Sequence, residues 1–192
     1  MTNIYFVRHA QPDYSCADPS ARPLTEEGMR DTAEVVRALR DVKLDYALCS
    51  PYRRSIDTIK QCALEHGLTI DTDIRLRERE SGRNSNNMEM FRKRWENLDY
   101  SEPDGESIGS VMKRNIEALN DLLRSHEGES IIIGTHGTAL SSILHYYDNS
   151  FGLDGFLRII DFMPYIVRLG FDGTELRDKE EILIVKKEFV QR

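Results

Sequence analysis

The sequence predicts an α/β fold, a three-layer α/β/α sandwich with a mostly parallel central sheet. Strand-like and helix-like segments alternate along the chain, which is the pattern of βαβ units. The early strand-like segments are unbroken apolar runs, as expected for strands that helices cover on both faces. The length of 192 residues, without a repeat or a linker rich in Pro, Gly or Ser, predicts a single domain over 1–192.

The first three elements predict one βαβ unit. Residues 4–7 form an apolar run that ends at charged residues, and residues 46–49 form the next strand. Between them, Thr25 has the features of a helix N-cap, because Glu26 and Glu27 follow it in the first turn. Apolar residues then recur at helical spacing up to Leu39. The two strands should be parallel and joined by a right-handed crossover.

The later elements are predicted by similar signals. Ser50-Pro51 is typical of the N-cap and first position of a helix, and Gly67 of its end. Ser107 begins a strongly amphipathic helix that runs to about residue 124. The other expected elements are an extended piece at 68–70, helices at 88–98 and 138–147, a buried strand at 131–133, and strands at 165–171 and 181–185 around Asp172-Gly173.

Residues 75–104 are polar and irregular, and we expect a lid or insertion at about 79–105. We expect Phe91 and Trp95 of its helix to pack within the lid; the alternative is that they form a wall of the substrate pocket. The charged stretches at 75–83 and 92–94 are expected to be solvated, as such runs usually are. Substrate specificity should reside in residues 83–104.

The composition excludes several kinds of partner. With 26 basic against 33 acidic residues, the net charge of −7 disfavours nonspecific binding to nucleic acid or to an anionic membrane. The longest apolar runs are far shorter than the ~18–20 residues that a bilayer span requires. Any anion that this protein binds must therefore be held by a local cluster of positive charge.

The cysteines and the N-terminal segment indicate the compartment. Cys16, Cys49 and Cys62 form no CxxC pair, which argues against a disulfide framework and against a thiolate zinc site. Residues 71–73, Asp-Thr-Asp, have no further ligands at a metal-binding spacing. The first residues lack the pattern of a secretory signal. We expect a cytoplasmic protein with reduced thiols, without a metal or a cofactor.

Polar clusters follow three of the predicted buried strands. Arg8-His9 comes after the first strand, residues 50–54 come after the second, and His136-Gly137 comes after the strand at 131–133. Ligands of open α/β sheets bind in the crevice beyond the carboxyl ends of the strands. If these strands are neighbours, two histidines, at least two arginines and helix N-termini face one pocket. Such a pocket suits a phosphate dianion.

The same residues resemble a known family. Arg8-His9-Ala10 is similar to the Arg-His-Gly signature of the histidine phosphatase superfamily, also called the phosphoglycerate mutase-like family. Residues 50–58 resemble its second block, Ser-Pro-Leu-x-Arg-Ala-x-Gln-Thr, which places the phosphate-binding arginine at Arg54 and not at Arg53. Three further segments resemble later blocks in the family's order: Leu76-Arg77-Glu78, Gly105-Glu106-Ser107 and Thr135-His136-Gly137.

The resemblance implies a metal-independent phosphomonoesterase that acts on a small phosphorylated metabolite. His9 would attack phosphorus and form phosphohistidine, which requires a neutral imidazole. The oxygens of the phosphoryl group would be bound by Arg8, Arg54 and His136. Glu78 would donate a proton to the leaving oxygen; Glu80 is the alternative donor.

Departures from the family pattern leave two other functions open. Ala10 replaces the signature glycine, and Pro12 and Ser15 stand where mutases often have Ser or Thr and Asn. A phosphoglycerate mutase would return the phosphoryl group to its substrate, and the missing mutase residues count against it. A binding protein that has lost turnover would hold phosphate without forming phosphohistidine.

The remaining histidines are interpreted as structural. His66, His126 and His145 fall within or at the ends of predicted helices, where histidine commonly stabilises local structure. The acidic surface is compatible with a monomer or a homodimer, and the sequence does not identify the substrate.

Overall fold

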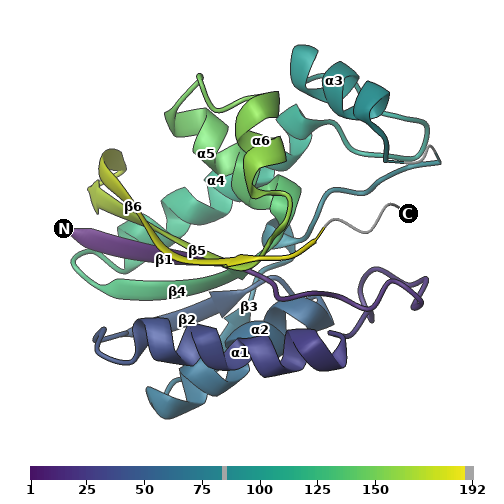
Figure 1. Cartoon of the computed structure of the whole chain (residues 1–192). Helices are drawn as coiled ribbons and strands as arrows, with labels where there is room; N and C mark the ends of the chain where they lie inside the picture. The colour runs from purple at the N-terminus through teal and green to yellow at the C-terminus, as the bar shows by residue number, and fades with distance from the viewer. Residues whose placement is uncertain (84–85, 189–192) are drawn as a thin grey trace.

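The computed structural model describes residues 1–83 and 86–188. Six strands form one mixed sheet in the order β3-β2-β4-β1-β5-β6, as Figure 1 shows. The pairs β3-β2, β2-β4 and β4-β1 are parallel, whereas β5 and β6 join the edge of the sheet as antiparallel strands. The strands are β1 (Thr2–Arg8), β2 (Tyr46–Cys49), β3 (Ile70–Thr72), β4 (Ser130–Thr135), β5 (Phe162–Asp172) and β6 (Glu175–Lys186).

Helices cover both faces of the sheet. In Figure 1, α1 and α2 lie on one face, and α4, α5 and α6 lie on the other. The helices are α1 (Glu26–Leu39), α2 (Arg53–Glu65), α3 (Met88–Glu96), α4 (Ile108–Ser125), α5 (Gly137–Tyr147) and α6 (Leu153–Ile159), with a short 3-10 helix η1 (Ile74–Leu76). The predicted three-layer α/β/α sandwich with a mostly parallel sheet is confirmed.

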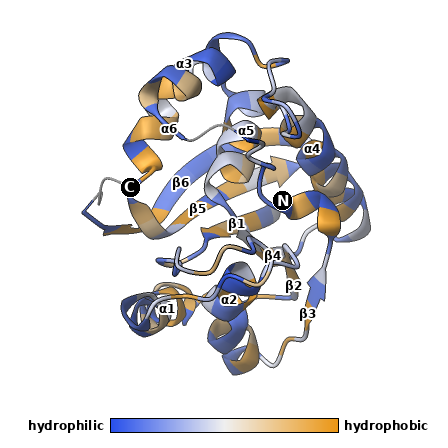
Figure 2. Ribbon diagram, turned by 90° about the vertical axis from the view of Figure 1, so that its right-hand side faces the viewer, coloured by the Kyte–Doolittle hydropathy of each residue, from blue (hydrophilic) through white to orange (hydrophobic). Residues whose placement is uncertain are grey.

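The central strands are buried on both faces, which explains their unbroken apolar runs. Along β4, Ile131 and Ile133 pack into the core beneath α4 and α5, whereas Ile132 between them packs into the core beneath α1 and α2. Ile4 and Tyr5 of β1 divide in the same way. Figure 2 shows hydrophobic residues along these central strands and a largely hydrophilic β6 at the edge. Each apolar face of the sheet thus has its own layer of helices.

The structure contains the helix caps that the sequence predicts at Thr25, Ser107 and Gly67. The Thr25 hydroxyl accepts a hydrogen bond from the Gly28 amide at 2.9 Å, and the Ser107 hydroxyl accepts one from the Ser110 amide at 3.1 Å. Gly67 has a φ of +68°, in the left-handed region that favours glycine, and it follows the last turn of α2. These caps fix where α1 and α4 begin and where α2 ends.

Several predicted boundaries were wrong. Helix α2 begins at Arg53 with Tyr52 as its N-cap, two residues later than predicted. The Ser50 hydroxyl accepts from the Tyr52 amide at 3.3 Å and also lies 2.7 Å from Nε2 of His136. The predicted extended piece at 68–70 lies two residues later, as β3. The last strand begins at Glu175 rather than residue 181, and α6 was not predicted at all.

The predicted insertion at 79–105 contains α3, and its residues 84–85 lie outside the described residues. Phe91 and Trp95 of α3 pack against Phe156 of α6, with ring centroids 5.2 and 5.8 Å apart. The expectation that the charged stretches are solvated was wrong for Arg79 and Arg94, which are buried. Both form ion pairs with the fully buried Glu102 side chain.

Membrane insertion through a helix is not supported by this architecture. Within residues 1–83 and 86–188, the helices are too short or too polar to cross a bilayer.

Candidate active site

Three strand ends meet at one edge of the sheet. The parallel register pairs Arg8 of β1 with Thr135 of β4, and Cys49 of β2 with Gly134 of β4. The residues that follow these strands are therefore neighbours across the sheet. The backbone shows this directly, because the His9 amide donates to the Thr135 carbonyl at 3.1 Å. The predicted convergence of the polar clusters is observed.

His9 is buried and its ring orientation is fixed. Its Nδ1 atom lies 2.8 Å from the carbonyl oxygen of Ala10. A carbonyl can only accept, so Nδ1 carries the hydrogen and the neutral ring keeps a lone pair on Nε2. Burial lowers the pKa of His9 well below its usual value, and the positive charges of Arg54 and Arg8 lower it further. His9 is therefore held as a neutral imidazole with an unprotonated Nε2.

His136 stands beside His9, with ring centroids 5.3 Å apart. Its Nε2 atom lies 2.7 Å from the Ser50 hydroxyl and 3.3 Å from the Ser55 hydroxyl. Burial lowers the pKa of His136 well below its usual value, with Arg54 and His9 adding to the effect. Its other nitrogen, Nδ1, is buried and has no hydrogen-bond partner among the described residues.

Arg8 and Arg54 bring two guanidinium groups to the same edge. Nη1 of Arg8 donates to the carbonyls at the end of α6 and the start of β5, at 2.8 Å to Ile160 and 3.2 Å to Phe162. Its Nε is buried without a hydrogen-bond partner in the described part of the chain. Arg54, in the first turn of α2, donates to the carbonyl of Pro19. A buried donor left free, such as Nε of Arg8, suits an anionic ligand.

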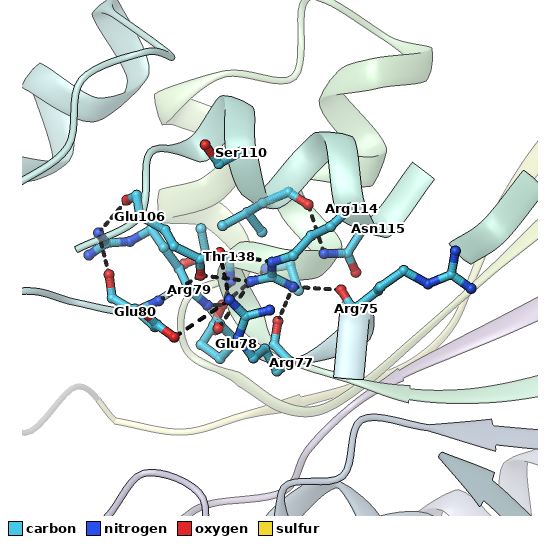
Figure 3. A network of polar contacts seen from close by, with 12 residues as sticks. Arg75, Arg77, Glu78, Arg79, Glu80, Glu106, Ser110, Arg114, Asn115 and Thr138 are labelled. Atoms are coloured by element: carbon cyan, nitrogen blue, oxygen red, sulfur yellow. Dashed lines mark hydrogen bonds and ion pairs between the residues drawn. The ribbon is translucent and has the colours of Figure 1, made fainter. Parts of the chain in front are cut away.

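Glu78 lies at the N-terminus of α5. One carboxylate oxygen accepts from the Thr138 amide at 3.0 Å, and the other accepts from the Ala139 amide at 3.1 Å and the Arg79 amide at 2.8 Å. Figure 3 shows Glu78 beside Thr138. Helix N-termini favour such an anion because their amides are unpaired.

The charge of Glu78 also acts on Arg8 and Arg54, the predicted phosphate-binding arginines. Burial lowers the pKa of both Arg8 and Arg54, and the charge of Glu78 acts on each in the opposite direction. Glu80, by contrast, has a side chain that is 56% exposed and faces Arg77 at 3.5 Å. Of the two candidate donors, the structure therefore brings Glu78 to the cluster.

Several supporting residues were missed by the sequence reasoning. The Thr58 hydroxyl accepts from the Ala10 amide at 3.0 Å and so fixes the backbone next to His9. The hydroxyls of Ser50 and Ser55 bracket His136. Arg22 adds positive charge, which contributes to the lowered pKa of His9. Among these residues, Ser50 and Thr58 match the family's second block, so the sequence could have identified them as candidates. Ser55 lies in the same block at a position where the family has Ala.

The other histidines have structural contacts. His66 bonds to the Cys62 and Val42 carbonyls, His126 stacks on Tyr46, and His145 bonds to the Phe151 carbonyl. Within the described ranges, no three His, Cys, Asp or Glu side chains come together as a metal site would need.

Comparison with known proteins agrees with this geometry. Residues 4–175 match the model of the histidine phosphatase superfamily (branch 1). Among curated proteins, the chain is similar to the probable phosphoglycerate mutase GpmB of Yersinia pestis (strain Pestoides F). The identity is 31% over an alignment of 158 residues, and the match covers 75% of this chain and 74% of that protein.

Solved structures share the fold. Phosphoserine phosphatase of Entamoeba histolytica, in complex with 3-phosphoglyceric acid, superposes with a TM-score of 0.76 at 17% identity over 98% of each chain. Mycobacterial glucosyl-3-phosphoglycerate phosphatase has a TM-score of 0.73 at 17% identity, covering 96% of this chain and 99% of that one. The family match over most of the chain shows that this protein belongs to the histidine phosphatase superfamily (branch 1).

Proposed function

We propose that this protein is a metal-independent phosphomonoesterase that acts on a small phosphorylated metabolite through a phosphohistidine intermediate. The observation that carries the proposal is the state of His9, a neutral ring whose Nδ1 hydrogen is held by Ala10 and whose Nε2 is free to attack. Arg8, Arg54 and His136 surround it and would bind the three non-bridging oxygens. In this role the unpartnered nitrogens of Arg8 and His136 would gain hydrogen-bond acceptors.

The reaction would proceed in two steps. In the first, the Nε2 lone pair of His9 forms a bond to phosphorus as the bond from phosphorus to the ester oxygen breaks. Glu78, whose carboxylate oxygens accept amide hydrogen bonds in the free protein, would act here in its protonated form and give that proton to the leaving oxygen, which departs as an alcohol. In the second, Glu78 takes a proton from a water molecule, and the oxygen of that water attacks phosphorus. The bond from phosphorus to Nε2 of His9 breaks, and inorganic phosphate leaves.

The substrate class is supported by the neighbours of this chain. The Entamoeba and mycobacterial proteins are, by name, phosphatases of phosphoserine and of glucosyl-3-phosphoglycerate. Both are small phosphorylated metabolites. We propose that residues 79–83 and 86–105 form a wall of the substrate site, since Arg79 follows Glu78 and is tied through Glu102 to Arg94 of α3.

A phosphoglycerate mutase is the second candidate, favoured by the similarity to GpmB. It would keep the same phosphohistidine but return the phosphoryl group to phosphoglycerate. Pro12 and Ser15 occupy positions where mutases often have Ser or Thr and Asn, which favours hydrolysis.

The proposal is tested by phosphate release from an aryl phosphate and a panel of phosphorylated metabolites, with a chelator present. Native protein and His9→Ala are compared, together with a His66→Ala control whose histidine is structural. Release that resists the chelator and is lost only in His9→Ala is expected. Isomerisation of phosphoglycerate that outpaces release would favour the mutase, and phosphate binding without either reaction would favour a binding protein.

A further inference from the structure

The guanidinium group of Arg114, in the second turn of α4, has every N–H donor engaged. Nε and Nη2 donate to the two carboxylate oxygens of Glu106 at 3.0 and 2.9 Å. Nη1 donates to the carbonyls of Arg75 and Arg77 at 2.6 and 2.7 Å, and Nη2 also donates to the carbonyl of Glu78 at 3.2 Å. Figure 3 shows this arrangement. Three of its five hydrogen bonds thus hold the backbone of the segment that carries Glu78.

Glu106 ties the same segment from the other side. Its carboxylate accepts from Nη2 of Arg77 at 2.9 Å and from the Glu80 amide at 3.0 Å, while its own amide donates to the Glu80 carbonyl. The side chains of Glu106 and Arg114 are only 14% and 12% exposed, so solvent screens this pair little. Glu106 therefore connects α4 to residues on both sides of Glu78.

Gly105 lets the two segments approach closely enough for these bonds. A Cβ atom at this position would lie 3.1 Å from the Glu80 carbonyl oxygen and 3.1 Å from the Gly82 amide nitrogen. Ser107 then caps α4, which places Arg114 two turns along the same helix. The Gly105-Glu106-Ser107 block, to which the reaction assigns no step, has a structural reason in this contact.

We propose that Arg114, oriented by Glu106, is a positioning residue that holds the proton donor Glu78 against the N-terminus of α5. This inference rests on the proposed function, since it requires Glu78 to act as the donor. The Glu78 side chain makes no bond to Arg114, and only its backbone does. Losing Arg114 would therefore leave the carboxyl group intact but free its segment to shift, and small displacements of a catalytic group are costly to rate.

The test uses kcat/KM, which covers only the steps up to phosphohistidine formation. A nitrophenyl phosphate has a good leaving group and needs little protonation, whereas an alkyl phosphate depends on the donor. The variants are Arg114→Ala, Arg114→Lys and Glu106→Gln, with Glu78→Gln as the reference for loss of the donor. Arg124→Ala is the matched control, because Arg124 lies on the same helix in an exposed pair with Asp121.

We expect the Arg114 and Glu106 variants to lose about tenfold or more in kcat/KM for the alkyl phosphate relative to the nitrophenyl phosphate. Lysine has three donors and no planar fork, so Arg114→Lys should show the same selective loss. Added methylguanidinium should restore alkyl phosphate cleavage in Arg114→Ala. If Arg114→Ala does not fold, the other two variants carry the test.

The outcomes separate this inference from the proposed function. If Glu78→Gln loses alkyl phosphate cleavage selectively while the Arg114 and Glu106 variants slow both substrates equally, Arg114 is merely structural and the inference is overturned. If the native protein shows no His9-dependent cleavage of either substrate, the proposed function itself has failed.

Discussion

Nδ1 of His9 lies 2.8 Å from the carbonyl oxygen of Ala10, the next residue in the chain. This contact decides which nitrogen of the ring can react, because the hydrogen is held on Nδ1 and the lone pair is left on Nε2. The Thr58 hydroxyl fixes the same peptide through the Ala10 amide. Alanine in place of the family's glycine keeps both backbone contacts, so the replacement does not disturb this arrangement.

The ionisation of His9 gives a first prediction. Burial and the charges of Arg54 and Arg8 lower its pKa, so the ring should remain neutral at pH values well below 6.5. Nitrogen NMR of the imidazoles, with His9→Asn to assign the signal, would follow the titration. A ring that gains its second proton near pH 6.5, or a hydrogen on Nε2, would contradict the account.

Stability should fall as the pH decreases. The pKa values of His9 and His136 are lowered in the folded state, so below about pH 6.5 the unfolded chain binds more protons than the native one. Each histidine should then cost up to about 1.4 kcal/mol of unfolding free energy per pH unit, down to its lowered pKa. Above pH 6.5 this loss is absent.

Urea unfolding between pH 5 and 7 measures that dependence. The slope should be shallower in His9→Asn and in His136→Asn, which remove one titrating ring each. Slopes equal to that of the native protein would show that these rings protonate as readily in the folded state as in the unfolded one.

The two carboxylates of the donor segment should behave differently. Glu78→Gln should slow cleavage of alkyl phosphates by about 10²-fold or more while leaving aryl phosphates much less affected, since only poor leaving groups need the proton. Glu80→Gln removes an exposed carboxylate and should change neither rate appreciably. The reverse pattern in kcat/KM would transfer the donor role to Glu80.

The buried Glu102 should be important for stability. Its side chain is fully buried between Arg79 and Arg94, so Glu102→Ala leaves two buried positive charges without their partner. The expected loss is about 3–5 kcal/mol of unfolding free energy. Glu34→Ala, which removes an exposed pair with Arg37, should cost at most about 1 kcal/mol. Similar values in urea unfolding for the two variants would refute the proposed importance of this ion-pair network.

Local signals in the sequence predicted the elements that position the site. The apolar runs of β1, β2 and β4 are recognisable because helices bury both of their faces. The site residues His9, Ser50 and His136 each come directly after the last residue of one of these strands. The Thr25 and Ser107 caps are equally local, since each hydroxyl bonds an amide three residues ahead. Features decided within a few residues could therefore be predicted.

Features decided by distant partners could not be predicted. Arg79 and Arg94 read as solvated because their shared partner, Glu102, lies 23 and 8 residues away. The choice between Glu78 and Glu80 depends on the amides of Thr138 and Ala139, some 60 residues later in the chain.

Short or exposed elements also escaped prediction. Helix α6 has seven residues, of which only Phe156 and Ile159 are buried, too few to show a helical period. The first half of β6 is rich in charge because it forms the exposed edge of the sheet.

The most direct test of the account is to trap the intermediate. Native protein is mixed with radiolabelled substrate and quenched in alkali within a turnover, and the modified peptide is identified by mass spectrometry. We predict acid-labile, alkali-stable phosphate on Nε2 of His9, absent from His9→Ala and retained in His66→Ala. Turnover in the native protein without any label on His9, or undiminished turnover in His9→Ala, would contradict the phosphohistidine mechanism.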